Sequence, residues 1–215
     1  DRAYEAGCSV CLLGYNSYAS GLDEFLTSLS SELRVPSDTS SANLYLSPAG
    51  SGVKWHFDRR QVFSLHLVGK KKWWYAPGAQ FPNPRLNFVP DFELHQVNHP
   101  YLNLVSVPAD EQSVACKLKR GDLLYLPAGT WHRTEALEAS IGLTLGFVPL
   151  SPLDLYLKTL EKTLSKDASW RRPMLPNESN SVLAAALQEL VENIPNIEVA
   201  ELLALLPGAG DQKKN

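Results

Sequence analysis

The strongest constraint on the fold lies in the middle of the chain, where short β-prone runs alternate with turn residues. Between residues 43 and 147 the runs are NLYLS, VKWHFD, QVFSLHLV, KKWWYA, NLVSV, VACKL, DLLYL and SIGLTLGF. Gly, Pro, Asn and Asp lie between them. Many short strands with turns between them are typical of a β-sandwich or barrel. This region is therefore predicted to be mainly β.

The N-terminal part is expected to contain one strand and one helix. The apolar stretch at residues 8–13 predicts a buried strand. Ser20 can cap the helix that follows, with Asp23 at the reciprocal position of a capping box. One apolar stripe on this helix is formed by Leu22, Phe25, Leu26, Leu29 and Leu33.

After Pro149 the pattern becomes helical again. Ser151 is a suitable cap and Pro152 suits the first helical position. SVLAAALQELVENI and EVAELLALL predict further helices. We therefore expect a catalytic domain at residues 1–150 and a helical segment at residues 151–215. The apolar stripes of that segment pack on the barrel or form a homodimer seam; they are Leu153, Leu157, Leu160, Leu164, Leu183, Leu187, Leu190, Leu202, Leu203 and Leu206.

The segment at residues 77–100 is rich in proline and shows little periodicity. A loop of this length in a compact domain is often functional. It is a candidate for a segment that covers a substrate.

Composition narrows the class of protein. A net charge of −3 and a pI of about 6.0 argue against a nucleic-acid binder that neutralises phosphates. The apolar runs are too short and interrupted for a membrane span. Three cysteines suit a reducing cytoplasm. Cys8 and Cys11 form a C-x-x-C without a second pair, and we expect both to be core residues.

Three residues suggest a metal site. His56 and Asp58 are two apart in VKWHFDRRQVF, so in a strand they face the same side. In GDLLYLPAGTWHR, a strand at residues 122–126 and a tight turn lead to His132. Two histidines and one carboxylate form the facial triad that leaves positions open on non-haem Fe(II). A solvated strand face is the simpler explanation of an isolated H-x-D pair, but it does not account for the distal histidine.

Two longer stretches carry a family resemblance. NLYLSPAGSGVKWHFDRRQVFSLHLVGKKKWWYAPG and LKRGDLLYLPAGTWHRTEAL resemble the Jumonji-C-type cupins, which are double-stranded β-helix oxygenases using Fe(II) and 2-oxoglutarate. The resemblance covers roughly residues 8–150 and implies His56, Asp58 and His132 as iron ligands. It also implies that Lys71, after a glycine turn, binds the distal carboxylate of 2-oxoglutarate. The implied substrate is a protein, a peptide or a small molecule.

The sequence departs from the family at two positions that commonly help to hold the co-substrate. Val53 stands where many members have Ser or Thr, and Val62 where several have Asn. Ser64 and His66 share the strand face of Val62 and can partly substitute. Tyr45 is a further candidate hydroxyl of the pocket.

The resemblance implies a hydroxylase, or a demethylase where the oxidised carbon is bound to nitrogen. Two alternatives remain open. One is another metal-dependent cupin enzyme, such as an isomerase or a dioxygenase without 2-oxoglutarate, which does not require Lys71. The other is a non-catalytic binding module that keeps the barrel, an alternative favoured by Val53 and Val62.

Overall fold

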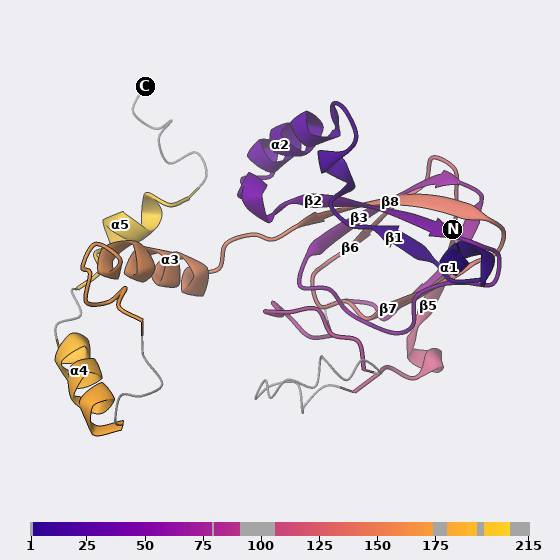
Figure 1. The fold of residues 1–215 in the computed structure, drawn as a ribbon. Coiled ribbons are helices and arrows are strands. Elements are labelled where there is room, and N and C mark those ends of the chain that lie inside the picture. Colours follow the sequence, from indigo (N-terminus) through magenta and orange to yellow (C-terminus); the bar gives the residue numbers. More distant parts are fainter. Residues whose placement is uncertain (1, 79, 91–105, 174–179, 193–195, 207–215) are drawn as a thin grey trace. The chain divides into compact units, whose positions relative to one another are not determined.

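The computed structural model describes residues 2–78, 80–90, 106–173, 180–192 and 196–206. The chain divides into two compact units, Asp1–Val148 and Pro149–Asn215. The described part of the first unit is built around two antiparallel sheets (Figure 1). The prediction of a mainly β, double-stranded β-helix fold is confirmed.

The larger sheet has five strands and the smaller has three. In spatial order, the larger contains β1 (Val10–Leu12), β2 (Ser41–Ser47), β8 (Ser140–Phe147), β3 (Gln61–Val68) and β6 (Leu123–Leu126). The smaller contains β5 (Val114–Lys119), β4 (Lys70–Tyr75) and β7 (His132–Ala136). Only Gly69, with φ 74°, separates β3 from β4, so one tight turn carries the chain from the larger sheet to the smaller.

Helix α2 (Leu22–Glu32) covers part of the outer face of the larger sheet (Figure 1). Leu26 is buried against apolar side chains that alternate along the strands. This cluster includes Val35, Ala42, Leu145 and Phe147, with Leu22, Leu29, Phe63 and Leu143 packed around it. One apolar core of this unit therefore lies outside the larger sheet, between the strands and α2. A second, formed by Val62, Trp73, Leu118 and Leu126, lies between the two sheets.

The inner face of the same sheet combines apolar residues such as Val62 with buried polar ones. On β3 the buried residues Ser64 and His66 alternate with Phe63 and Leu65. A small barrel filled by side chains is usually apolar throughout its interior. Buried polar residues beside the apolar ones are typical of a barrel that encloses a ligand site.

The outer face of the smaller sheet carries charges stacked on indoles. The Arg133 guanidinium lies 3.9 Å from the ring centroid of Trp74 and 5.4 Å from that of Trp55. Lys72 Nζ lies 4.2 Å from the ring centroid of Trp74. These cation–π contacts cover apolar rings while the charges stay near water.

Two sequence predictions about local structure were wrong near the N-terminus. Helix α2 begins after Gly21, which has φ 78° and is the N-cap, and Ser20 makes no cap. Asp23 instead accepts a hydrogen bond from Asn16 Nδ2 at 2.8 Å. Cys8 is exposed and Cys11 half-buried, so the C-x-x-C pair does not belong to the core.

The strands also differ from the prediction in two places, and a third predicted strand is not tested. Residues 53–58 form no full strand, and only isolated bridges hold His56 and Phe57. The run at residues 103–107 lies mostly outside the described residues. Strand β7 was not predicted, because HRTEA has few β-prone residues and depends on its pairing with β4.

The second unit contains three described helices, α3 (Pro152–Leu164), α4 (Asn180–Glu192) and α5 (Val199–Leu203). Ser151 Oγ accepts a hydrogen bond from Asp154 N, and the Asp154 side chain accepts one from Ser151 N. The predicted cap and the proline at the helix start are thus confirmed. Within the described ranges, no helix combines the length and apolarity that crossing a bilayer requires.

Candidate metal centre

The structure brings the three predicted ligands together. One potential ligand atom from each of His56, Asp58 and His132 lies within 4.8 Å of the others. Two backbone hydrogen bonds place the two histidines side by side. His56 N donates to His132 O at 3.0 Å, and His132 N donates to His56 O at 2.8 Å. Asp58 Oδ2 lies 3.7 Å from His132 Nε2.

Both imidazoles are oriented in a way that suits metal binding. Nδ1 of His56 donates to the Lys54 carbonyl at 2.8 Å, and Nδ1 of His132 donates to the Thr130 carbonyl at 2.9 Å. Because a carbonyl can only accept, Nε2 of each neutral ring keeps its lone pair. Burial, and next the proximity of His56, lower the pKa of His132, which favours the neutral ligand form. These residues fit a divalent metal ion.

Aromatic packing fixes the ligands in place. Phe57, between His56 and Asp58, is fully buried and meets Trp131 edge-on at a centroid distance of 5.1 Å. The ring of Trp73 stacks on His132 at 5.7 Å. The side chains next to the ligands therefore limit their rotamers, as preorganisation of a metal site requires.

Lys71 lies in the same cavity as the three ligands. This cavity has a volume of about 250 Å³. The Lys71 side chain enters from the smaller sheet and is only 5% exposed. Its Nζ donates to Ser47 Oγ at 2.8 Å, and burial lowers its pKa to about 8. The described contacts include no carboxylate partner for this ammonium, so the cavity has a strong preference for an anion.

The neighbouring lysines point elsewhere, as alternation along β4 predicts. Lys70 makes an exposed ion pair with Glu138 at 3.7 Å, and Lys72 packs on Trp74. Among the three lysines of GKKKWW, only Lys71 lines the cavity.

Tyr45 and Ser64, the two further predicted residues, also line the cavity. Lys71 Nζ is 6.0 Å from the Tyr45 ring centroid. Burial, followed by the proximity of Cys11, raises the pKa of Tyr45, so the phenol stays protonated and can donate. Ser64 Oγ accepts a hydrogen bond from Thr144 Oγ1 at 3.4 Å.

Several other cavity residues were not predicted. Thr134 and Thr144 could have been found from alternation, because each is two residues from an inward-facing position. Ser47 does not line the cavity, but it shares the strand face of Tyr45 and accepts the hydrogen bond from Lys71. Asn87 and Val89 come from the proline-rich segment, where no periodicity reveals which residues face the cavity. Val53 and Val62 line the cavity at the positions where the sequence departs from the family.

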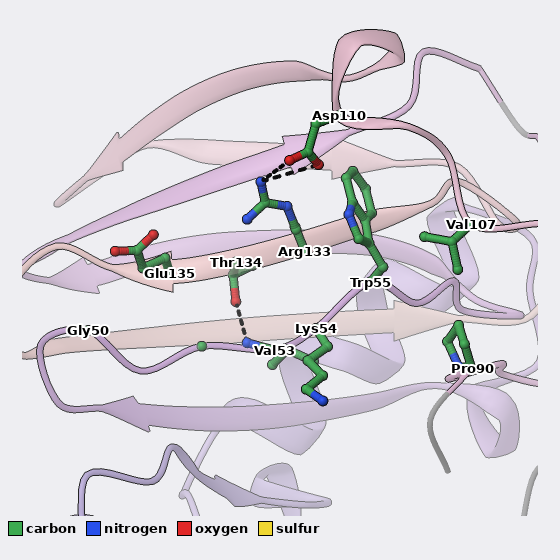
Figure 2. A pocket seen from close by; sticks show the side chains of 11 residues that line it. Gly50, Val53, Lys54, Trp55, Pro90, Val107, Asp110, Arg133, Thr134 and Glu135 are labelled. Atoms are coloured by element: carbon green, nitrogen blue, oxygen red, sulfur yellow. Dashed lines mark hydrogen bonds and ion pairs between the residues drawn. The ribbon is translucent and has the colours of Figure 1, made fainter. Parts of the chain in front are cut away.

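A second, more open pocket of about 560 Å³ adjoins the first, since Val53 and Thr134 line both. Figure 2 shows Arg133 extending beside Trp55 toward Asp110, with a distance of 3.4 Å between the charged groups. Thr134 Oγ1 accepts a hydrogen bond from Val53 N at 3.1 Å at the boundary of the two pockets (Figure 2). We call this pocket the outer groove.

The fold and the ligand group together define a class of protein. The JmjC domain family matches residues 23–155. This match covers more than half of the chain, and the chain belongs to the JmjC domain family.

Its relatives include bacterial and animal proteins. The chain is 28% identical over 207 residues to the uncharacterized protein YxbC of Bacillus subtilis, covering 88% of this chain and 62% of that protein. It is 29% identical over 178 residues to ribosomal oxygenase 1 of Danio rerio, covering 79% of this chain and 30% of that protein. The chain thus spans less than two thirds of the length of these relatives.

Solved structures support the fold. The X-ray structure of YcfD from Escherichia coli matches with a TM-score of 0.52 and 20% identity, over 90% of this chain and 50% of that one. A YcfD structure in complex with cobalt and 2-oxoglutarate matches with a TM-score of 0.50 and 19% identity, over 86% of this chain and 47% of that one.

Proposed function

We propose that this chain is the catalytic domain of an Fe(II)- and 2-oxoglutarate-dependent oxygenase that hydroxylates a protein. The observation that carries the proposal is one cavity containing both a His-Asp-His group and a buried lysine. Two neutral imidazoles and one carboxylate leave open positions on Fe(II). The relatives named as ribosomal oxygenases and the YcfD complex support the same assignment.

In this proposal His56, Asp58 and His132 hold the iron, while Lys71 binds the distal carboxylate of 2-oxoglutarate. Tyr45 and Ser64 lie where their hydroxyls can bind the co-substrate. Together the bound iron, 2-oxoglutarate and O₂ supply the oxidation that inserts oxygen into a substrate C–H bond and releases succinate and CO₂. The protein orients the reactants and excludes water from them.

Lys71 provides the charge that the co-substrate requires. Its ammonium is desolvated in the free protein because the side chain is only 5% exposed, and this burial lowers the pKa of the group. An incoming carboxylate restores a partner to this charge and becomes fixed at one end. The opposite end of the co-substrate then lies toward the ligand group, which the same cavity contains.

The outer groove supports a polypeptide substrate. It is wider than the metal cavity and meets it at Val53 and Thr134. A peptide segment can lie along the groove, where the hydrogen-bonded pair Val53 and Thr134 forms the wall between the groove and the metal cavity. Hydroxylation is the expected result, and demethylation results where the oxidised carbon is attached to nitrogen.

The test is to add Fe(II) and 2-oxoglutarate to the metal-free protein without O₂. A weak visible charge-transfer band is expected from chelation of the metal by the keto acid. A metal-dependent isomerase or a binding module gives no such band, so its absence contradicts the proposal. With O₂ and candidate peptides, succinate release and a mass gain of one oxygen atom identify the substrate.

We also propose a cytoplasmic location and a homodimer. Support for the first is that all three cysteines are free thiols. Support for the second is the exposure of Leu153, Leu157 and Leu203 in the second unit, at 50%, 45% and 52%. Light scattering at tens of micromolar tests the dimer, and a monomer mass contradicts it.

A further inference from the structure

The buried ammonium of Lys71 is hydrogen-bonded to a serine that lies outside the metal cavity. Lys71 Nζ donates to Ser47 Oγ at 2.8 Å, and Ser47 is completely buried. Lys71 lines the cavity, whereas Ser47 does not. An ammonium has three protons to donate, so one is used by Ser47 and two remain for the cavity. The direction of the lysine tip therefore depends on a hydroxyl outside the cavity.

Two further serines extend this contact toward the N-terminal segment. Ser9 Oγ donates to Ser47 Oγ at 3.0 Å, and the Ser9 and Ser51 hydroxyl oxygens lie 2.9 Å apart. Because a hydroxyl oxygen has two lone pairs, the proton from Ser9 occupies one of those on Ser47 and leaves the other for Lys71. Ser9 thereby orients the Ser47 hydroxyl. We call Ser47, Ser9 and Ser51 the serine row.

The position of Ser9 follows from the pairing of β1 with β2. Val10 lies opposite Leu46 in the antiparallel register, so Ser9, one residue earlier, lies beside Ser47. Ser9 precedes residues 23–155, which the JmjC domain family matches. The contact on Ser47 is thus contributed by a part of the chain that the family model does not include.

We propose that the serine row positions Lys71 for the distal carboxylate of 2-oxoglutarate, so that the N-terminal segment takes part in co-substrate binding. The proposal deepens the proposed function and rests on it. In the free protein the row already holds the tip of the lysine, so the incoming carboxylate does not have to order a long, flexible side chain. Ordering such a side chain on binding lowers affinity by about two- to tenfold.

The outer members of the row have no direct access to the co-substrate. Ser9 and Ser51 line a separate pocket of about 410 Å³, and neither of them lines the metal cavity. An effect of Ser9 on the affinity for 2-oxoglutarate must therefore pass through Ser47 and Lys71. This makes Ser9 a positioning residue, and its dependence on Ser47 can be measured.

The test compares two ligands that differ only at the distal end. 2-Oxopentanoate has the keto acid and the chain length of 2-oxoglutarate, but a methyl group replaces the distal carboxylate. Binding to Mn(II)-loaded protein without O₂ is measured by calorimetry. Ser47→Ala should weaken 2-oxoglutarate binding about two- to tenfold and leave 2-oxopentanoate binding unchanged, because only 2-oxoglutarate uses Lys71.

A double-mutant cycle separates positioning from a general effect on the fold. Ser9→Ala should weaken 2-oxoglutarate binding about twofold in the wild type and cause no further loss in Ser47→Ala. Ser9→Thr, which keeps the hydroxyl, should restore wild-type binding. The matched control is Ser140→Ala, which should bind both ligands normally. Ser140 lies opposite Ser47 in the register and is also buried, but its Oγ has no hydrogen-bond partner among the described residues.

Three results would overturn the proposal. The first is that Ser47→Ala binds 2-oxoglutarate as the wild type does. The second is that Ser47→Ala loses the same affinity for both keto acids, which indicates a structural role. The third is that Ser9→Ala lowers affinity equally in the presence and absence of the Ser47 hydroxyl. A wild-type protein that binds Mn(II) but not 2-oxoglutarate contradicts the proposed function itself, and this result is distinct from the other three.

Discussion

The two sheets enclose the same cavity but differ on their outer faces. The outer face of the larger sheet is apolar, and α2 packs on part of it through Leu26. The outer face of the smaller sheet carries Lys72 and Arg133 stacked on indoles, together with the exposed Lys117. We infer that apolar packing outside the larger sheet stabilises the fold, whereas the smaller sheet contributes ligands from its inner face and solubility from its outer face.

The largest effect should follow from a substitution on the inner face of the smaller sheet. His132→Ala removes one of three metal ligands, and Arg133→Ala changes the next residue, which faces outward. Removing a residue that only hydrogen-bonds to a metal ligand lowers metal affinity by about 10–100-fold. Removing a ligand itself should therefore lower metal affinity by more than about a hundredfold. Metal analysis after dialysis measures this. Full occupancy in His132→Ala, or metal loss in Arg133→Ala, would contradict the assigned faces.

The second effect contrasts neighbours on β4. Lys71→Met should weaken 2-oxoglutarate binding more than about a hundredfold, because one member of a buried charge pair is lost. Lys72→Met should leave this affinity unchanged, since Lys72 packs on Trp74 outside the barrel. Calorimetry with the Mn(II) form measures both. A larger loss in Lys72→Met would mean that the register is wrong.

The third effect concerns stability rather than binding. Phe147 is buried in the cluster beneath α2, and Phe147→Ala should lower the free energy of unfolding by about 3–5 kcal/mol. Lys117→Ala, on the exposed face of the smaller sheet, should change it by about 0.5 kcal/mol or less. Urea denaturation compares the two. Equal changes in the free energy of unfolding would show that the two outer faces contribute equally to stability.

The smallest effect is a pH dependence that originates from Lys71. Its pKa is about 8 in the folded protein and about 10.5 when unfolded, so between these values the unfolded chain binds more protons. The stability contribution of Lys71 should therefore rise with pH from 8 to 10.5, by up to about 3 kcal/mol. The contribution of Lys71 is measured as the difference in unfolding free energy between the ligand-free wild type and Lys71→Met, followed as a function of pH. Parallel pH curves for the two proteins would refute it.

The sequence predicted which three residues meet at the candidate metal centre because each depends on a short, local pattern, whereas Lys71 was indicated by the family resemblance. His56 and Asp58 are two residues apart, and His132 follows a turn that Gly129 permits with φ 79°. The bridge between His56 and His132 then requires only that the two segments meet. The mainly β fold was predictable from the frequency of turn residues.

Features that depend on distant partners could not be predicted. Alternation shows that Ser64 and Phe63 face opposite sides, but it does not show which side is inside the barrel. The location of α2 decides this, because it covers the apolar face. In the same way, the position of Gly142 between Tyr45 and His66 arises from the register of three strands, and no segment of the sequence alone contains that information.

The stacking of Trp73 on His132 has an optical consequence. An indole held against a metal ligand is close enough for a bound paramagnetic ion to quench its fluorescence. Of the five tryptophans in the chain, Trp73 is described in ring contact with a ligand imidazole. Emission from the unlabelled protein should therefore fall as cobalt or iron is added, and Trp73→Phe should remove most of that signal while the metal still binds. The protein thus contains its own spectroscopic reporter of metal loading.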